Sequence, residues 1–510
     1  MTGRPDSETT DFLVLGGGTS GCVVAARLLA AGHRVTLIEA GPDYGSLIDG
    51  SWPRELLDAA ALPLDSHDWG YCGVGAGGQP LRYERARVLG GCSAHNGCTQ
   101  TAGWAGDYDE WAAQGSVGWD AASLSEDFEH AMDALRLRFY SEEEIQPFHR
   151  AFIDSSVDAG LNYQHDLHQL DGAQGVGCAP VNVVDGMRMN TAFAFLDAWR
   201  SSPELTVIDR AHVETVLIQG GTVAAVGARY RRDGQLHVAR ADRVVLCAGA
   251  YGSPEILLRS GIGPAGHLSD LGIPNAVHLP GVGENLQEHP AVHLEYAGSA
   301  ELASALADFA ATQWLPEEQT VVKLRSPHAD GPFDLHVYPW IEPDADLEHG
   351  WRAVFPVSQL RPRSRGTVRL RSADPDAAAV VDPGFLSDPG AADLGSLRFG
   401  LNWITTNIVE GTMSRFLGHA LHDLAQYRDS EVDEWIRRHH THYWHPAGSC
   451  RMGAETDPMS VVRHDGSVIG VEGLTIADAS IFPDIPRATP ALPVVVVAER
   501  IARFLLDGHR

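Results

Sequence analysis

Residues 11–21 decide the fold at the start of the chain, and they read DFLVLGGGTSG. The apolar run 11–15 is typical of a short buried strand, and the Ala- and Leu-rich run 22–31 is typical of a helix. The glycine-rich turn therefore lies between a strand and a helix. Such a turn presents free backbone amides and a helix N-terminus, which can hold a pyrophosphate. The turn residues that we expect at the ligand are Gly16, Gly18, Thr19, Ser20 and Gly21.

A second apolar run, 34–38, follows the helix and ends at Glu39 and Ala40. An acidic side chain at the end of the second strand can accept hydrogen bonds from the ribose hydroxyls of an adenine nucleotide, and it repels a 2′-phosphate. Strand, turn, helix, second strand and terminal acid thus occur in the order of a dinucleotide-binding unit. The sequence predicts that Glu39 and Ala40 belong to the cofactor site.

The length and charge of the chain restrict its partners. Its 510 residues exceed what one hydrophobic core usually holds, so we expect two structural units. The net charge of −29 argues against nucleic acid or an anionic membrane as a partner, because both would be repelled. This charge is either a solvated acidic surface or a feature that favours a cationic substrate such as an amino alcohol.

The seven cysteines are scattered and odd in number, which predicts reduced thiols in a cytoplasmic protein. The first ten residues are polar and acidic, unlike a secretory signal, and no apolar run approaches the ~20 residues that span a bilayer. No metal site is expected, because the cluster His439, His440 and His442 has no spaced carboxylate or cysteine set beside it.

Four later segments extend this organisation. The runs 243–250 and 474–480 have the pattern of buried strands that return to the nucleotide sheet, and the run 493–506 predicts a helix that closes the same domain. Residues 365–371 alternate apolar and charged side chains, as a half-exposed antiparallel strand does. Together with the run 333–340, they predict a separate antiparallel sheet in the second unit.

Two long motifs carry a family resemblance. Residues 87–97, RVLGGCSAHNG, and residues 249–263, GAYGSPEILLRSGIG, resemble the two signatures of the glucose-methanol-choline (GMC) oxidoreductases, and the first is most similar to choline oxidase-like members. Residues 280–290 and 445–448 resemble further motifs of that family. The resemblance implies an α/β fold with a Rossmann-like FAD-binding domain and a discontinuous substrate domain on an antiparallel sheet. We expect the FAD-binding domain at 1–150, 188–290 and 440–510, and the substrate domain at 151–187 and 291–439.

The resemblance implies FAD as the cofactor. By that likeness the loop residues Gly90, Gly91, Ser93, Asn96 and Gly97 lie along the isoalloxazine and pyrophosphate, where small residues let the backbone approach the ring. Asp478 and Ala479 are expected near the ribityl and pyrophosphate groups, and Val213 near the adenine. His95 is expected either to be covalently joined to the flavin 8-methyl group, as in choline oxidase-like members, or to pack beside that edge of the ring.

His445 is the expected catalytic base. Alcohol oxidation needs a group that takes the hydroxyl proton while a hydride moves to the flavin, and a histidine suits that task. In the family the histidine before Pro-x-Gly has this role. A second histidine or asparagine usually faces it, and Thr489, flanked by Pro490, occupies that place in this sequence. A threonine hydroxyl can hydrogen-bond but cannot act as a second base at neutral pH.

The substrate is expected to be a small alcohol. In choline oxidase-like members an acidic residue after His-Pro faces the trimethylammonium group, whereas His289-Pro290 is followed here by Ala291, so we expect a primary alcohol or an aldehyde hydrate rather than choline. Carboxylates that could substitute are Glu295, Glu342 and Asp344. Three activities stay open: an oxidase that uses oxygen, a dehydrogenase with a quinone or protein acceptor, and a non-redox lyase. A homodimer is one candidate assembly.

Overall fold

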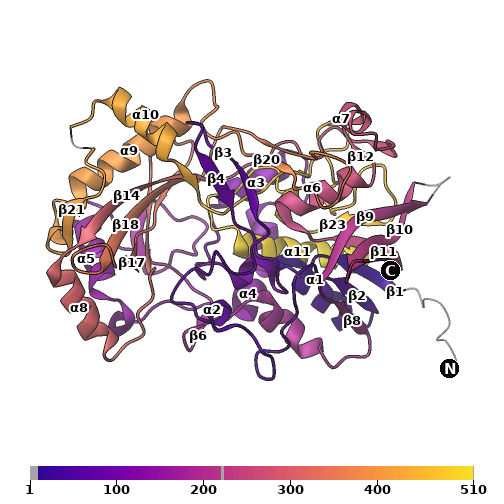
Figure 1. Cartoon of the computed structure of the whole chain (residues 1–510), viewed down its shortest axis with the longest axis horizontal. Coiled ribbons are helices and arrows are strands. Elements are labelled where there is room, and N and C mark those ends of the chain that lie inside the picture. Colours follow the sequence, from indigo (N-terminus) through magenta and orange to yellow (C-terminus); the bar gives the residue numbers. More distant parts are fainter. Residues whose placement is uncertain (1–9, 220–222, 425, 509–510) are drawn as a thin grey trace.

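The computed structural model describes residues 10–219, 223–424 and 426–508. A mainly parallel sheet lies towards one end of the molecule and a large antiparallel sheet towards the other, and the first and last described residues, Thr10 and Gly508, lie near the parallel sheet (Figure 1). Residues far apart in sequence contribute to each sheet. The space between the two sheets holds the site described below.

The parallel sheet is built around β1 (Thr10–Leu15). β1 pairs with β2 (Val35–Ile38) and β11 (Gln235–Leu246), while β8 (Leu205–Ile208) continues the sheet beyond β2 and β23 (Leu474–Ile476) pairs with β11. The first half of β11 leaves this layer and pairs antiparallel with β10 (Ala224–Arg232), which in turn pairs with β9 (Ala211–Gln219). The strands predicted at 11–15 and 34–38 are therefore confirmed. Those predicted at 243–250 and 474–480 are strands only as far as residues 246 and 476, because helical turns begin at residues 249 and 479.

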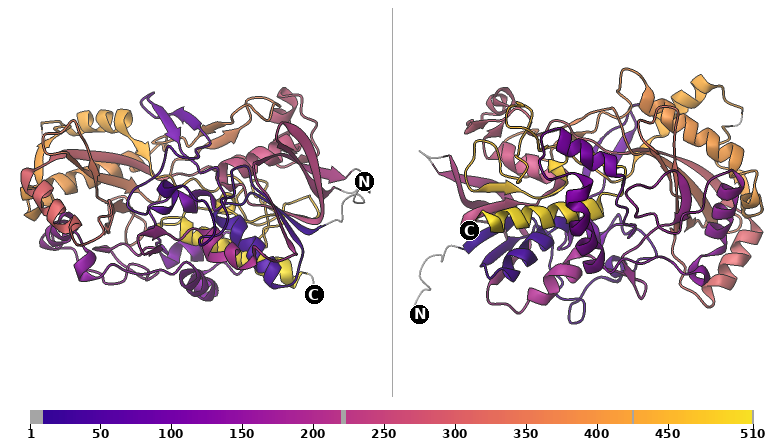
Figure 2. Two further views of the ribbon diagram at one scale, coloured as in Figure 1. Left: turned by 60° about the horizontal axis from the view of Figure 1, so that its bottom comes forward. Right: turned by 180° about the vertical axis from the view of Figure 1, so that it is seen from behind.

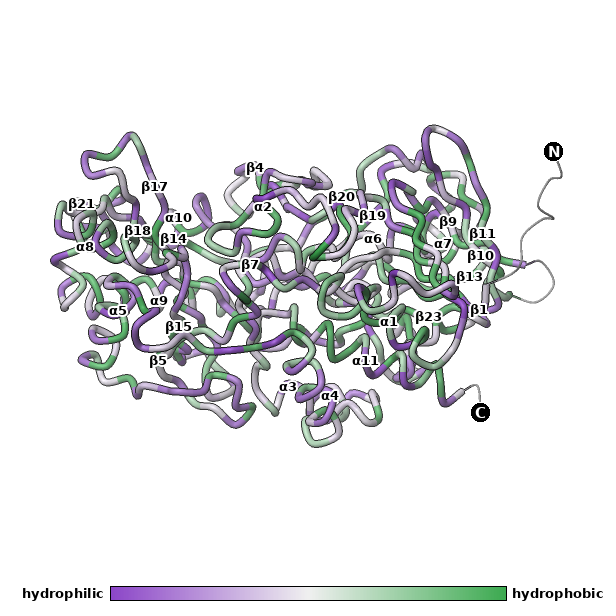
Figure 3. Tube along the Cα trace, turned by 90° about the horizontal axis from the view of Figure 1, so that it is seen from below, coloured by the Kyte–Doolittle hydropathy of each residue, from purple (hydrophilic) through white to green (hydrophobic). Residues whose placement is uncertain are grey.

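Two helices from opposite ends of the sequence pack together beside this sheet. α1 (Thr19–Ala30) and α11 (Ala491–Asp507) are mostly buried and apolar, and Arg27 joins Glu499 through an ion pair of 2.5 Å (Figure 2). Hydrophobic segments run along both helices in Figure 3. The predicted closing helix is confirmed, and it carries the C-terminus back to the first βαβ unit.

The antiparallel sheet follows the order β21 (Leu417–Ala420), β14 (Pro290–Gly298), β18 (Trp351–Gln359), β16 (Leu335–Val337), β15 (Thr320–Leu324) and β5 (Gly175–Cys178). β17 (Trp340–Pro343) also pairs with β18, and β22 (Thr441–His442) with β14. The run 333–340 thus belongs to this sheet, as predicted.

The prediction that residues 365–371 join the same sheet is wrong. β19 (Thr367–Arg369) pairs with β20 (Val380–Asp382) in a separate two-stranded sheet. The physical reason is that another segment takes the backbone groups of this run: Gly366 N donates to Leu286 O at 2.8 Å, and Val368 N donates to Gly283 O at 2.7 Å.

Helices cover one face of the antiparallel sheet. Phe148 and Phe152 of α5 (Pro147–Asp158) contact the ring of Phe355 at centroid distances of 5.8 and 6.2 Å, and α9 (Ala392–Asn407) packs its Gly400 against Val357. Because side chains alternate along a strand, His336 and Tyr338 point away from these helices. This second face is turned towards the nucleotide-binding unit.

Smaller elements connect these layers. The helices are α2 (Arg54–Leu57), α3 (Ala105–Ala113), α4 (Ala121–Ala134), α6 (Gly249–Arg259), α7 (Ala265–Asp270), α8 (Ala300–Ala310) and α10 (Asp429–His439), and the strands are β3 (Tyr71–Val74), β4 (Pro80–Tyr83), β6 (Val183–Val184), β7 (Met187–Arg188), β12 (Ile262–Gly263) and β13 (Val277–His278). All seven cysteines are unpaired thiols. Within the three described ranges, no helix has the length and apolar character needed to cross a membrane. The predicted domain boundaries stay a prediction.

Candidate active site

One long cavity extends from the glycine-rich turn after β1 to the antiparallel sheet. It brings together most of the residues that the sequence singles out. The predicted residues that line it are Gly16, Gly18, Thr19, Ser20, Glu39, Ala40, Gly91, His95, Asn96, Gly97, Val213, His445, Asp478, Ala479, Thr489 and Pro490. Gly21, Gly90 and Ser93 do not line it, and they shape the backbone around it instead.

The turn after β1 and the loop 90–97 touch through their backbones. A Cβ on Gly91 would lie 2.6 Å from the Cα of Gly18, and Gly91 has a φ of +54°. Gly90 N donates to Gly17 O at 2.7 Å, and a Cβ on Gly21 would lie 1.9 Å from Gly16 O. Only glycine permits such close approach. The N-terminus of α1 therefore opens directly into the cavity beside the loop.

Two buried carboxylates hold this end of the cavity in shape. Glu39 accepts hydrogen bonds from Gly17 N at 2.8 Å and from Gly41 N at 2.7 Å, and burial raises its pKa to about 7. Asp478 accepts from Gly249 N at 2.9 Å, from Ser253 Oγ at 2.5 Å and from Ser480 N at 2.8 Å. Burial raises the pKa of Asp478 as well. Both carboxylates line the cavity and fix the backbone of the expected ribose and pyrophosphate sites.

The loop 90–97 presents His95 to the same cavity. Ser93 Oγ donates to Gly90 O at 2.6 Å, which holds the left-handed turn at Gly90. His95 is buried, its Nε2 has no hydrogen-bond partner in the described structure, and burial lowers its pKa to about 4. A neutral imidazole with an unused nitrogen, next to a glycine-lined cradle and a helix N-terminus, fits a dinucleotide whose ring system reaches this loop. The residues present therefore fit FAD.

His445 lies farther along the cavity and contacts a second histidine. The Nδ1 atoms of His289 and His445 are 3.0 Å apart, so one of them carries the shared hydrogen. The backbone carbonyls of Leu360 and Pro486 also face His289. His289 Nε2 makes no hydrogen bond in the described structure, so the contact between the two Nδ1 atoms is compatible with either ring as the donor. When His445 Nδ1 carries the shared hydrogen, the lone pair of His445 is on Nε2, and His445 lines the cavity.

Burial keeps both histidines neutral. It lowers the pKa of His289 to about 3, and it lowers the pKa of His445 well below the ordinary histidine value, with further lowering by neighbouring His289 and Arg85. A neutral histidine can accept a proton, and the fall in pKa means that it stays unprotonated in moderately acidic solution.

Glu288 connects the backbones that carry these histidines. Its Oε1 accepts from His289 N at 2.9 Å and from His445 N at 2.7 Å. Trp444, directly before His445, has a left-handed φ of 61°, and it is held by Arg85 Nη2 on its carbonyl at 2.9 Å and by Glu84 on its indole N–H at 3.0 Å. Such strain is found where a side chain must point in one direction. Here it directs His445 into the cavity.

Thr489 lies on the same cavity but makes other contacts. Its hydroxyl accepts from Thr101 N at 3.0 Å and donates to Thr99 O at 3.0 Å. The hydrogen-bonding partner that the structure gives to His445 is His289, and no bond from Thr489 to His445 occurs in the described part of the chain. A catalytic contribution of Thr489 stays a prediction.

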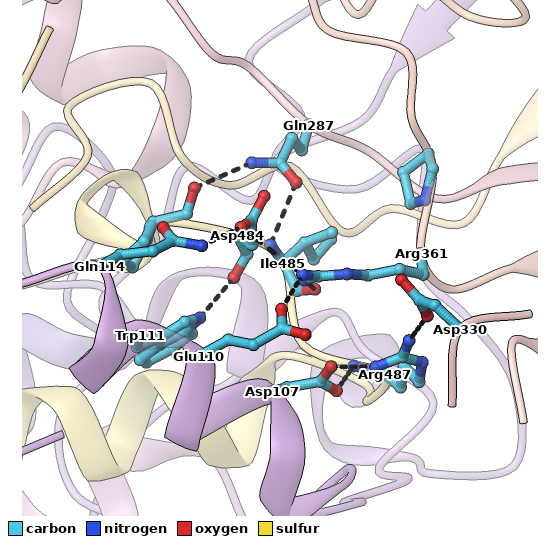
Figure 4. A network of polar contacts seen from close by, with 12 residues as sticks. Asp107, Glu110, Trp111, Gln114, Gln287, Asp330, Arg361, Asp484, Ile485 and Arg487 are labelled. Carbon is cyan, nitrogen blue, oxygen red and sulfur yellow. Dashed lines mark hydrogen bonds and ion pairs between the residues drawn. The ribbon is translucent and has the colours of Figure 1, made fainter. Parts of the chain in front are cut away.

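A buried polar network fixes the segment that leads to Thr489 (Figure 4). Arg487 is fully buried, forms ion pairs with Asp107 and Asp330, and donates from its backbone N to Asp107 at 2.8 Å. Trp111 donates to Asp484 O at 2.9 Å. These contacts join α3, the 484–489 segment and the loop around Asp330.

Sequence reasoning missed two groups of the site, His289 and Glu288. Both occur within the quoted motif 280–290, so the signal was present in the sequence. Their role was not visible, because the side chain that faces His445 comes from the segment directly before β14, far from His445 in sequence.

Comparison with known proteins agrees with this architecture. The GMC oxidoreductase family matches the chain over residues 10–291 and again over residues 362–498. Mitochondrial choline dehydrogenase of Mus musculus is 32% identical over 98% of this chain and 89% of its own length, and choline oxidase of Arthrobacter globiformis is 31% identical over 98% and 94%. The crystal structure of pyridoxine 4-oxidase from Mesorbium loti superposes with a TM-score of 0.86 at 26% identity, covering 98% of this chain and 100% of that one. The glycine-lined cradle, the paired histidines and these likenesses together show that the chain belongs to the GMC oxidoreductase family and is an FAD-dependent oxidoreductase.

Proposed function

We propose that this protein oxidises a primary alcohol or an aldehyde hydrate, with His445 as the base and oxygen as the final electron acceptor. The observation that carries the proposal is the pair His289–His445, which leaves a free nitrogen of a neutral histidine in the cavity that also holds the cofactor cradle. FAD, when bound, supplies the hydride acceptor. The relatives named choline oxidase and choline dehydrogenase support an alcohol as the substrate class.

The protein side of the reaction is a proton transfer at one atom. His445 Nε2 takes the hydroxyl proton, which places positive charge on the imidazole. His445 Nδ1–H continues to donate to His289, and Glu288 holds the backbone of both residues in place. The aromatic side chains Tyr443 and Trp444 line the cavity beside His445 and limit access of water.

Anaerobic mixing of the purified yellow protein with a panel of primary alcohols, amino alcohols, sugars and aldehydes tests this function. We expect one class to bleach the flavin absorbance, and His445→Ala to slow bleaching by at least ~10²-fold while FAD stays bound. A rate near that of the parent protein in His445→Ala would rule out the base role. Peroxide formation in air identifies an oxidase, and its absence with rapid reduction of a quinone identifies a dehydrogenase.

A non-redox lyase is the second candidate. The observation that favours it is Thr489. Its hydroxyl cannot act as a second base, whereas members of this family usually carry a histidine or asparagine at that position. A lyase would leave its flavin oxidised when substrate is added. Failure of the whole panel to bleach the flavin, together with conversion of an added substrate, would support that reading.

We further propose that His95 forms a covalent bond to the flavin. Its Nε2 is buried without a partner, the residue lines the cavity, and the imidazole is neutral, as a nucleophile must be. Bond formation would replace one C–H bond of the flavin 8-methyl group by a bond to Nε2; that hydrogen and the imidazole hydrogen would leave as protons, and the two electrons would pass through the flavin to oxygen. We expect acid-precipitated protein to stay yellow and His95→Ala to release its flavin. A colourless pellet from the parent protein would refute the bond.

We also propose a cytoplasmic location, because seven unpaired thiols suit a reducing compartment. The homodimer stays a prediction. Light scattering on the purified protein would give the oligomeric state.

A further inference from the structure

Arg85 places a positive charge in the wall of the catalytic cavity. It lies two residues after β4 and lines the cavity with its half-buried side chain. Its Nη2 donates to Trp444 O at 2.9 Å, so the guanidinium group lies against the residue directly before His445. Its Nε donates to the backbone carbonyl of Glu84. Nη1 forms no hydrogen bond within the described ranges, which leaves this end of the guanidinium group available to a ligand.

The charge of Arg85 reaches both histidines that the proposed function assigns to the cofactor and the substrate. Burial is the main cause of the lowered pKa of His95 and of His445, and Arg85 lowers the pKa of each further. Because the interaction between charges weakens with distance, Arg85 lies near both the loop 90–97 and the base. A ring system that extends from His95 towards His445 would lie within reach of this charge.

Arg259 is the other arginine that lines the cavity, and its charge is compensated. It forms a buried ion pair with Glu255, one helical turn away in α6. Glu84 and Glu288 attract Arg85, but neither carboxylate forms an ion pair with it. Among the described arginines of the cavity, Arg85 is thus the one without a paired counter-charge.

The carboxyl groups near Arg85 have other partners. Glu84 accepts from the indole N–H of Trp444 at 3.0 Å. Glu288 accepts from two backbone N–H groups, and burial raises its pKa, which favours the neutral form. The other ionisable groups that face Arg85 are Cys92 and Tyr251.

The carboxylates that the sequence offered for the substrate site leave Arg85 uncompensated as well. Glu295, Glu342 and Asp344 lie within ion-pair distance of Arg352, at 3.1, 3.7 and 2.5 Å, and none of them lines the cavity. Glu318 does line the cavity, but its pKa is raised to about 8, mainly by burial. At neutral pH this carboxyl group is mostly protonated.

Reduction of the cofactor creates a charge that Arg85 can stabilise. Hydride transfer brings two electrons and one proton to FAD, while the hydroxyl proton goes to His445. The ring system therefore gains one negative charge. A charge that is held in place beside a buried site stabilises an opposite charge that develops there, and charge near the ring is one means by which a protein tunes a flavin. Arginine is not deprotonated in proteins, so its charge is present at every pH of catalysis.

We propose that Arg85 is the fixed positive charge that stabilises the reduced flavin, and that it raises the reduction potential of the bound cofactor. The hydrogen bond to Trp444 O holds the guanidinium group at the cavity wall. This inference concerns the cofactor alone, so it holds for any substrate and for any electron acceptor.

Sulfite binding to the holoenzyme tests the proposal without an alcohol. Sulfite adds reversibly to oxidised flavins and places negative charge on the ring, and the loss of flavin absorbance gives its dissociation constant. No substrate proton reaches His445 in this experiment, so the effect of Arg85 is measured apart from that of a protonated base. We expect Arg85→Gln, whose amide can still donate to Trp444 O, to bind sulfite at least ~10-fold more weakly than the parent protein.

Two further variants separate charge from packing. Arg85→Lys keeps the positive charge and should bind sulfite within about threefold of the parent protein. Arg82→Gln is the matched control, because Arg82 is an exposed arginine of β4 that does not line the cavity, and it should bind sulfite as the parent does.

The reduction potential gives a second readout. Anaerobic photoreduction beside a reference dye measures it, and a tenfold change in the equilibrium between the two redox states equals about 30 mV for a two-electron couple. The potential of Arg85→Gln should fall by at least that amount, whereas the potentials of Arg85→Lys and Arg82→Gln should stay near that of the parent.

Unchanged sulfite affinity and potential in Arg85→Gln would overturn the proposal. Equal losses in Arg85→Gln and Arg85→Lys would overturn it too, because they would assign Arg85 to packing alone. If Arg85→Gln does not retain FAD, Arg85→Met serves as the second neutral variant; loss of FAD from both neutral variants with retention in Arg85→Lys supports a role of the charge, and loss from all three contradicts it. A panel of alcohols that fails to bleach the flavin would count against the alcohol-oxidising function alone, since neither readout uses an alcohol.

Discussion

In the proposed mechanism, the pKa of His445 sets the acid limit of catalysis. Burial and the neighbouring positive groups lower this pKa well below the ordinary value of about 6.5. The base acts only when it is unprotonated, so a lowered pKa moves the loss of activity to lower pH. We expect kcat/KM for a neutral alcohol to stay level as pH falls through 6.5 and to decline only in more acidic solution. Stopped-flow flavin reduction measures the profile, and a half-maximal point at or above pH 6.5 would contradict the burial argument.

In the proposed mechanism, His289 acts through His445 and is a positioning residue. Its Nδ1 lies 3.0 Å from His445 Nδ1, and in that mechanism it accepts the hydrogen on that atom. We expect His289→Leu to slow flavin reduction by ~10-fold or more, because the His445 ring loses the hydrogen-bonding partner that orients it. His289→Asn should restore much of the rate, since its amide oxygen can accept the same hydrogen bond. Equal rates in the two variants would show that only packing matters at this position.

At the scale of elements, the contact between the α1 turn and the loop 90–97 depends on glycine. A Cβ on Gly91 would meet the Gly18 backbone at 2.6 Å, and its φ of +54° disfavours any other residue. We expect Gly91→Ala to cost about 1–2 kcal/mol from the left-handed backbone alone, and to lower the content of bound FAD. Absorbance ratio and thermal unfolding measure both effects.

Gly266→Ala is the matched control for this change. Gly266 lies in α7, and a Cβ there would meet nothing within 4 Å. It should leave FAD content unchanged and stabilise the protein by up to about 1 kcal/mol, because alanine favours a helix. A normal FAD content in Gly91→Ala would show that the loop can move away from the turn.

At the scale of the whole molecule, the ion pair between Asp107 and Arg487 joins parts that are far apart in sequence. Both side chains are fully buried, so removing the charge of Asp107 leaves the buried Arg487 with the exposed Asp330 as its remaining counter-charge. We expect Asp107→Asn to lower the free energy of unfolding by about 3–5 kcal/mol, as measured by urea denaturation. Asp433→Asn, which breaks a partly exposed pair with Arg398, should cost about 0–1 kcal/mol. Similar costs for the two variants would mean that water reaches the buried pair.

The sequence by itself determined the first βαβ unit and the cofactor class, and it predicts His445 as the base. These features depend on residues that are neighbours in sequence. Each short stretch holds its own signal: the spacing of apolar residues, the glycines that the turn requires, or the motif around His445. Local patterns also found the strand at 333–340. They placed 365–371 in the wrong sheet, because a half-exposed alternating strand pairs equally well with any free edge.

Only the tertiary structure decided which side chains meet in the cavity. His289, directly before β14, contacts His445, and Glu318, in the segment before β15, lines the cavity. Neither placement can be predicted from a short stretch of sequence. The sequence predicts Thr489 as the partner of His445, whereas the structure gives His445 a hydrogen bond with His289. Long-range packing, which decides which side chains meet, is the reason for the difference. Burial, which lowers the pKa of His445 and raises that of Glu318, is likewise a property of the assembled fold. A sequence specifies which groups are available, whereas long-range packing fixes their distances and the loss of water around them.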